Sequence, residues 1–287
     1  MYVKSITRKS RTLFVVTIDQ SGSMAGEVTI AARTLSKAEI VAEVTNDLLA
    51  ELVERARRGD GVRDYYDVAI IGYSGEGVRS LLSDDRPWMP ITELDAACIE
   101  ECNVDRECVD ENGEPRIVNH FTRRWIKAVA TGLTPMYEAL LMAHEIVEAW
   151  CEMEENRESF PPQIFNITDG ESTDCDYVDI SEIASRIKSC TTRDGAALLY
   201  NIHIASQPYR PSLIFPSPLE VDQWRDCSAA MLSLYNSASD MPQLFERAIM
   251  RLKGEKSLSR YKAMSYNASV AELITILNIG SISVKRA

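Results

Sequence analysis

Two kinds of hydrophobic pattern alternate along the chain. Short continuous apolar runs predict strands buried on both faces, as in parallel sheets, and apolar positions recurring every three or four residues predict amphipathic helices. Strands are expected at residues 13–18, 68–73, 163–168, 198–205 and, as a last short strand, 230–235. Helices are expected at residues 28–58, 135–155, 180–189 and 241–252.

This alternation predicts an α/β fold with a doubly wound, mostly parallel central sheet and helices on both faces. Residues 76–82 follow a glycine-containing turn and are expected to form one antiparallel edge strand. The pattern is lost after residue 86, and we expect an irregular insertion at residues 96–124. The main domain is expected to span residues 1–253, followed by a C-terminal extension, 254–287, that packs on the body or docks a partner.

The composition is that of a globular protein, with 45% hydrophobic and 26% charged residues. The 31 basic and 43 acidic residues give a net charge of −12, which argues against nucleic-acid binding as the main role. No apolar segment has the form of a signal peptide or the length of a membrane span. We therefore expect a cytoplasmic protein without a membrane partner, its seven cysteines being reduced thiols.

Two of the predicted strands run into an aspartate. The first, "TLFVVTID", ends at Asp19 and continues to Ser21 and Ser23, while a later strand leads directly to Asp169. Thr134 stands just before a predicted helix. Because the carboxyl ends of parallel strands share one edge of the sheet, these side chains are expected to meet there. The alternatives are that Asp19, Ser21, Ser23 and Thr134 only cap helices and that Asp169 belongs to a simple turn.

A buried bare carboxylate is costly, so a positive group is expected at this edge. The set that converges contains only oxygen ligands, and its members are Asp19, Ser21, Ser23, Thr134 and Asp169. Such a set suits a hard divalent cation, Mg²⁺ or alternatively Mn²⁺ or Ca²⁺. We expect the hydroxyls to bind the ion directly and the aspartates to hold its waters, which leaves one coordination position open. Glu171 and Asp174, in "TDGESTD", are expected to be solvated loop residues rather than ligands.

At these residues the chain resembles the von Willebrand factor type A (vWA) domain and its metal-ion-dependent adhesion site (MIDAS). That site is written Asp-x-Ser-x-Ser, then a distant Thr, then a distant Asp. Here the pattern reads Asp19-Gln20-Ser21-Gly22-Ser23, Thr134 and Thr168-Asp169-Gly170, within residues 12–253. The stretches "LTPMYEAL", "TDGESTD" and "WMPITELD" are similar to those of bacterial intracellular members associated with tellurium-resistance and stress-response clusters.

The resemblance implies a Rossmann-like fold and a non-catalytic role in protein–protein interaction. A partner protein's Asp or Glu would complete the coordination of the ion, within a bacterial stress-response or signalling complex linked to a kinase or phosphatase. The alternative is a Mg²⁺-dependent phosphohydrolase on a similar sheet. Haloacid-dehalogenase-like phosphatases need a second aspartate two positions after the first, where this chain has Ser21, and no nucleophile with an adjacent base stands out. We therefore expect no enzymatic activity.

The insertion holds a weaker candidate for a zinc site. Cys98, Cys102 and Cys108 lie in "CIEECNVDREC", and His120 could be a fourth ligand. Their spacing differs from the paired CxxC of zinc ribbons. The alternative is a helical turn with ordinary thiols.

Overall fold

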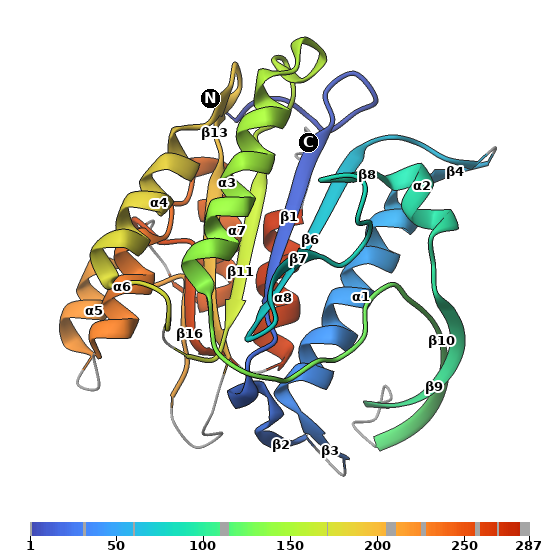
Figure 1. Ribbon diagram of the computed structural model, residues 1–287, viewed down its shortest axis with the longest axis horizontal. Helices are drawn as coiled ribbons and strands as arrows, with labels where there is room; N and C mark the ends of the chain where they lie inside the picture. The colour runs from blue at the N-terminus through green and yellow to red at the C-terminus, as the bar shows by residue number, and fades with distance from the viewer. Residues whose placement is uncertain are drawn as a thin grey trace.

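A central mixed sheet lies between layers of helices in the computed structural model (Figure 1). The structure describes residues 2–281 except 31–32, 60, 110–114, 171, 205–210, 225–227, 256–258 and 269. The strand order is β15-β16-β14-β11-β1-β6-β7, and β8 also pairs with β6. The strands are β1 (Thr12–Asp19), β6 (Tyr66–Ser74), β7 (Gly77–Ser80), β8 (Met89–Pro90), β11 (Gln163–Thr168), β14 (Leu198–Ile204), β15 (Leu213–Ile214) and β16 (Met264–Ala268).

The five strands in the middle of the sheet, β6, β1, β11, β14 and β16, run parallel to one another. The predicted fold class is therefore confirmed. Antiparallel strands lie at both edges, with β7 and β8 on β6 and β15 on β16. The sequence predicted the antiparallel strand only at the β7 edge and missed the two-residue β15.

Helices cover both faces of the sheet. They are α1 (Lys37–Ala56), α2 (Ile91–Ala96), α3 (Met136–Glu152), α4 (Tyr177–Ser189), α5 (Pro218–Gln223), α6 (Ala229–Ser237), α7 (Gln243–Lys253) and α8 (Val270–Ser281). The 3₁₀ turns are η1 (Gly22–Ala25) and η2 (Glu154–Asn156). The small strand pairs β4 (Arg57–Arg58) with β5 (Gly61–Val62), and β12 (Thr191–Thr192) with β13 (Gly195–Ala196), lie outside the sheet. Within the described ranges, no helix has the length and apolar character needed to cross a membrane.

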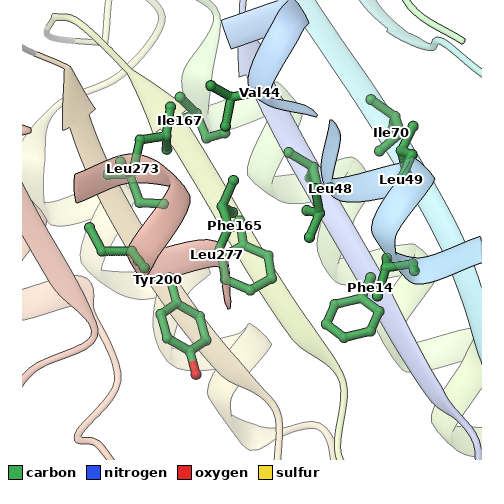
Figure 2. Packing of buried hydrophobic residues seen from close by; sticks show 14 of the residues in the cluster. Phe14, Val44, Leu48, Leu49, Ile70, Phe165, Ile167, Tyr200, Leu273 and Leu277 are labelled. Atoms are coloured by element: carbon green, nitrogen blue, oxygen red, sulfur yellow. The ribbon is translucent and has the colours of Figure 1, made fainter. Parts of the chain in front are cut away.

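Each face of the sheet packs its own apolar core, because successive side chains of a strand point to opposite faces. On one face Phe14 and Phe165 meet helices α1 and α8, and Phe165 stacks on Tyr200 with ring centroids 4.7 Å apart (Figure 2). On the other face Leu13 and Val15 pack against α3 and α4. Burial on both faces explains why these strands appear in the sequence as continuous apolar runs.

The predicted helix at residues 28–58 begins later than expected. Residues before it form the hairpin of β2 (Glu27–Ile30) and β3 (Arg33–Ser36), and α1 begins at Lys37. The start is fixed by a capping box: Ser36 accepts the backbone N–H of Glu39, and the Glu39 carboxylate accepts the N–H of Ser36 at 2.8 Å. The prediction was wrong because the β-branched residues of β2 were counted into a helical period.

The predicted strand at residues 230–235 is wrong, since this segment lies in helix α6. The last parallel strand is β16, in the segment 254–287 that was expected to be an extension, and it pairs with β14. Helix α8 of the same segment adds Leu273, Ile276 and Leu277 to the core that α1 also lines. The described part of the extension is thus built into the sheet and core of the body.

The insertion expected to be irregular is instead an antiparallel hairpin of β9 (Glu100–Val109) and β10 (Pro115–Arg124), beside α1 and apart from the central sheet (Figure 1). The side chains of Cys102, Cys108 and His120 lie outside the described residues. The backbone alone places Cys102 and Cys108 six residues apart on one strand, a separation of about 20 Å at ~3.3 Å per residue. The hairpin replaces the helical turn that was the alternative here, and the zinc hypothesis, which depends on these undescribed side chains, stays a prediction.

Candidate functional site

The carboxyl end of β1 delivers Asp19, which is fully buried. Its Oδ1 accepts the backbone N–H of Ser21 at 2.9 Å, and its Oδ2 accepts the hydroxyl of Thr168 at 2.8 Å. Burial raises the pKa of Asp19, the hydrogen bonds from Ser21 and Thr168 oppose that rise, and the nearby charge of Asp169 adds to it. Both donors are neutral groups, so they do not supply the positive charge that a buried carboxylate needs.

A chain of hydroxyls connects the first strand end to the Asp169 strand end. The Oγ atoms of Ser21 and Ser23 are 3.0 Å apart, and Ser23 Oγ donates to Asp169 Oδ1 at 2.6 Å. Strands β1 and β11 are parallel neighbours, which is why residues 146 positions apart in the chain meet here. Ser21 and Asp169 are buried, whereas Ser23 is exposed, so solvent reaches this cluster from the Ser23 side.

The third predicted segment, which carries Thr134, lies against the other two. Gly22 N donates to Gly132 O at 3.0 Å, and Thr131 N donates to Gln20 O at 2.7 Å. The same loop also lies against Gly75, in the turn between β6 and β7. Gly132 has a φ of +70°, and a Cβ on it would lie 2.5 Å from the Cα of Gly75, so only glycine allows the two backbones to come this close. The loop before Thr134 is therefore held against the Asp19 loop by backbone contacts.

Thr134 itself is joined to the loop that follows Asp169. Thr134 N donates to Thr173 Oγ1 at 2.9 Å, and Thr173 N donates to Thr134 O at 3.0 Å. Thr134 is buried, with 7% of its surface exposed. The structure thus brings all three predicted segments together at one edge of the sheet, and all five predicted residues lie on them.

The Thr134 hydroxyl does not cap helix α3, which was the alternative for this residue. The first-turn N–H groups of Tyr137 and Glu138 instead donate to the Asp174 carboxylate, at 3.2 and 3.0 Å. Asp174 is an exposed loop residue, as expected, and it also caps helix α3. Glu171 lies outside the described residues. Among those that are described, the Thr134 hydroxyl has no hydrogen-bond partner and remains available to a ligand.

Sequence reasoning missed one charged residue at this edge, Lys37. Its Nζ lies 2.5 Å from Asp169 Oδ2, and the two side chains are 7% and 1% exposed. The backbone of Lys37 is also tied to the segment that follows Ser23, because Lys37 N donates to Gly26 O at 2.9 Å. Gly26 in turn lies close to Ser23, since a Cβ on Gly26 would be only 3.2 Å from Ser23 O. The capping box at residues 36–39 was the signal that could have placed Lys37 at a helix start near the site.

His203 also lies beside the site, at the strand next to the one that carries Asp169. It stands near the carboxyl end of β14, and its Nδ1 accepts the N–H of Asn267 at 3.2 Å. Burial lowers the pKa of His203 to about 4. Near pH 7 this imidazole is therefore neutral and adds no positive charge beside Asp169.

The donor set fits a hard cation and does not fit a soft one. The hydroxyl oxygens of Ser21, Ser23 and Thr134 and the carboxylates of Asp19 and Asp169 are all oxygen ligands. Across the part of the chain that the structure describes, three or more His, Cys, Asp or Glu residues nowhere gather into a metal-binding group. A cation at this edge would therefore depend on the hydroxyls.

A cavity of about 520 Å³ lies elsewhere, between α1, β10 and α8. Its walls include Leu48, Phe121 and Ile274, together with the acidic residues Glu51 and Glu54. None of the residues of the strand-end site lines it. The cavity and the site are separate features of the molecule.

Comparison with known protein families finds no match for the chain, and comparison with curated proteins finds none either. Among solved structures the chain is similar to a von Willebrand factor type A protein from Catenulispora acidiphila, with 14% identity and a TM-score of 0.41 over 68% of this chain. The match spans 34% of that protein, about a third of its length.

The chain is also similar to an uncharacterised membrane spanning protein from Vibrio fischeri. The identity is 16% and the TM-score 0.28, over 68% of this chain and 71% of that protein. Likenesses at this level decide neither family nor function.

Proposed function

We propose that this protein is a non-catalytic, metal-dependent protein–protein interaction module. The observation that carries the proposal is the contact of Ser23 Oγ with Asp169 Oδ1 at 2.6 Å, within a cluster that also holds Ser21 and Asp19. Residues from separate segments supply only oxygen ligands there, and the exposed Ser23 marks the side from which a partner can approach.

The hydroxyls of Ser21, Ser23 and Thr134 would bind the divalent ion, and Asp19 and Asp169 would supply the negative charge around it. Mg²⁺ suits this set, with Mn²⁺ and Ca²⁺ as alternatives. When bound, the ion supplies a positive centre with an open position for an acidic ligand. A hydroxyl can donate its hydrogen to a carboxylate and still offer its oxygen lone pairs, so these serines can serve both neighbours.

The order of the motif along the chain, which resembles the vWA adhesion site, supports a partner carboxylate as the natural ligand. An Asp or Glu from the partner would form a charge-assisted contact at a partly buried site, the kind that contributes most to a protein interface. By the same resemblance, we propose a stress-response or signalling complex linked to a kinase or phosphatase as the setting. The opposing candidate function is a phosphohydrolase of the haloacid-dehalogenase-like kind, which would need an acid at position 21. This chain has Ser21 there, and its hydroxyl contacts that of Ser23.

The most direct test uses Thr134, because its hydroxyl can be removed without breaking a hydrogen bond among the described residues. Thr134→Val removes the hydroxyl at nearly constant shape, and Thr134→Ser keeps it. We expect Mn²⁺ affinity, measured by electron paramagnetic resonance, to fall about tenfold or more in Thr134→Val, the effect of about 1.4 kcal/mol for one lost ligand, and to persist in Thr134→Ser. Thr131→Val, in the same loop, is the matched control and should bind Mn²⁺ like the wild type.

A second measurement addresses the partner. Immobilised wild-type protein should retain a partner from cell extract in Mg²⁺ and release it on chelation, and Asp19→Ala and Thr134→Val should retain none. Purified protein should not hydrolyse phosphoesters or nucleotides. Mg²⁺-dependent hydrolysis that is lost in Asp19→Asn would instead establish the phosphohydrolase.

A further inference from the structure

Lys37 occupies a position that is unfavourable for a lysine in two respects. Its side chain is 7% exposed, and lysine is rarely buried without an ion-pair partner. It is also the first residue of α1, where the helix dipole disfavours positive charge. The contact of its Nζ with Asp169 Oδ2 at 2.5 Å offsets both costs. A fixed positive charge is thus placed on a carboxylate of the proposed ion site.

We propose that Lys37 regulates this site, by weakening ion binding to the free protein and strengthening the hold of the ion-loaded site on a partner's carboxylate. The inference rests on the proposed function and assigns Lys37 a positioning role, since its ammonium acts through Asp169. Nothing in the adhesion-site motif itself includes this residue, which reaches the site from a helix start 132 positions away from Asp169 in the chain.

The charges at the site explain the weaker ion binding. Both oxygens of Asp169 already have donors, Ser23 on Oδ1 and Lys37 on Oδ2. A divalent ion that draws on the Asp169 charge therefore competes with an ammonium that is already there. In a partly buried site the repulsion between the two cations is only weakly screened.

The same charges explain the stronger hold on an acid. Asp19 and Asp169 carry two negative charges and Lys37 one positive charge, so these three described side chains together carry a net charge of minus one, and a divalent ion changes the sum to plus one. Without Lys37 the loaded site would be neutral. The lysine thus makes the loaded site more attractive to one more carboxylate. Ion binding and acid binding favour each other through the charge of the ion itself, and Lys37 raises the affinity of the loaded site for the acid.

The competing explanation is that Lys37 is only a clamp between the start of α1 and the end of β11. The two explanations predict opposite changes when the charge is removed. Loss of a clamp loosens the cluster of Ser23 and Asp169, so the ion binds more weakly. Loss of a competing charge lets the ion bind more tightly.

The experiment compares Mn²⁺ binding by the full chain in the wild type and in Lys37→Met, which keeps the apolar stem of the side chain. We expect about tenfold tighter Mn²⁺ binding in Lys37→Met, the effect of removing one nearby cation from a weakly screened site. Acetate serves as a stand-in for the partner's carboxylate. At constant ionic strength it should tighten Mn²⁺ binding to the wild type more than to the variant. Lys37→Gln repeats the test if Lys37→Met does not fold, as judged by its thermal transition.

Lys9→Met is the matched control, because it removes an exposed lysine just before the amino end of β1. It should leave Mn²⁺ affinity unchanged. Unchanged or weaker binding in both Lys37 variants, with the wild type binding Mn²⁺, would overturn the inference and leave the proposed function standing. If neither the wild type nor any Lys37 variant binds Mn²⁺, the proposed function fails and the inference fails with it.

Discussion

Buried carboxylates lie at both ends of the sheet, and they differ in the groups that donate to them. At the amino end Asp67 accepts the indole N–H of Trp150 at 2.8 Å and the guanidinium of Arg11 at 3.4 Å. Asp194 accepts two backbone N–H groups, at 3.0 and 3.2 Å. At the carboxyl end Asp19 and Asp169 also accept one nitrogen donor each, the N–H of Ser21 and the ammonium of Lys37, but each accepts a hydroxyl as well.

The difference matters because nitrogen donors of these kinds have no lone pair for a metal ion, whereas a hydroxyl oxygen keeps its own. The acids at the amino end are therefore committed to holding the fold, and those at the carboxyl end can also serve a cation. Residue type and burial are the same at the two ends. The presence of a hydroxyl among the donors distinguishes the candidate ligands from the structural acids.

The largest effect that tests this comparison is expected at the amino end. Asp67→Ala would leave the buried Trp150 N–H without its acceptor and remove one of the ion pairs of Arg11, so we expect a loss of about 3 kcal/mol in the free energy of unfolding. The loss should be the same with Mn²⁺ and with chelator, as measured by urea denaturation. A loss that differs between Mn²⁺ and chelator would show that Asp67 also affects ion binding, and the two ends of the sheet would then not differ as described.

The next effect belongs to the carboxyl end. Mn²⁺ at a hundredfold excess over its dissociation constant should stabilise the wild type by about 2.7 kcal/mol. The double variant Ser21→Ala/Ser23→Ala should lose this gain, which a thermal shift with and without the ion would measure. Ser10→Ala, which removes a hydroxyl at the amino end, is the control and should keep it. If Mn²⁺ still stabilises the double variant, the hydroxyls of Ser21 and Ser23 are not ligands of the ion.

The smallest effect concerns Asp174, an acid at the carboxyl end that caps a helix. Asp174→Ala should lower the free energy of unfolding by about 1 kcal/mol, the usual cost of a lost cap. Thr134 keeps its backbone bonds to Thr173, so stabilisation by Mn²⁺ should persist. If that stabilisation disappears, an acid at this edge contributes to ion binding whichever groups donate to it, and the comparison of donors is wrong.

The sequence predicted the features that depend on local pattern. Strand β11 was placed at residues 163–168, as observed, because a strand buried on both faces leaves an unbroken apolar run. The convergence of Asp19, Ser21, Ser23, Thr134 and Asp169 followed from the geometry of parallel strand ends. That they bind an ion stays a prediction.

Features that depend on distant contacts were missed. No local pattern announces that Lys37 meets Asp169, because the pair is separated by 132 positions and became visible only once α1 was seen to start at Lys37. The short apolar run at residues 230–235 fits a strand or a buried helix equally well, and α6 is the outcome. Strand β16 contains Ser265 and Asn267, so it lacks the continuous apolar run of the other strands.

Strand β16 has a consequence for biosynthesis. It pairs with β14 but is separated from it by some sixty residues of the chain, so a nascent chain exposes the open edge of β14 until residue 268 has left the ribosome. Open strand edges are sites of mispairing between chains. A fragment cut after α7 would carry that edge permanently, together with the surface of α1 that α8 covers, and should aggregate when expressed alone.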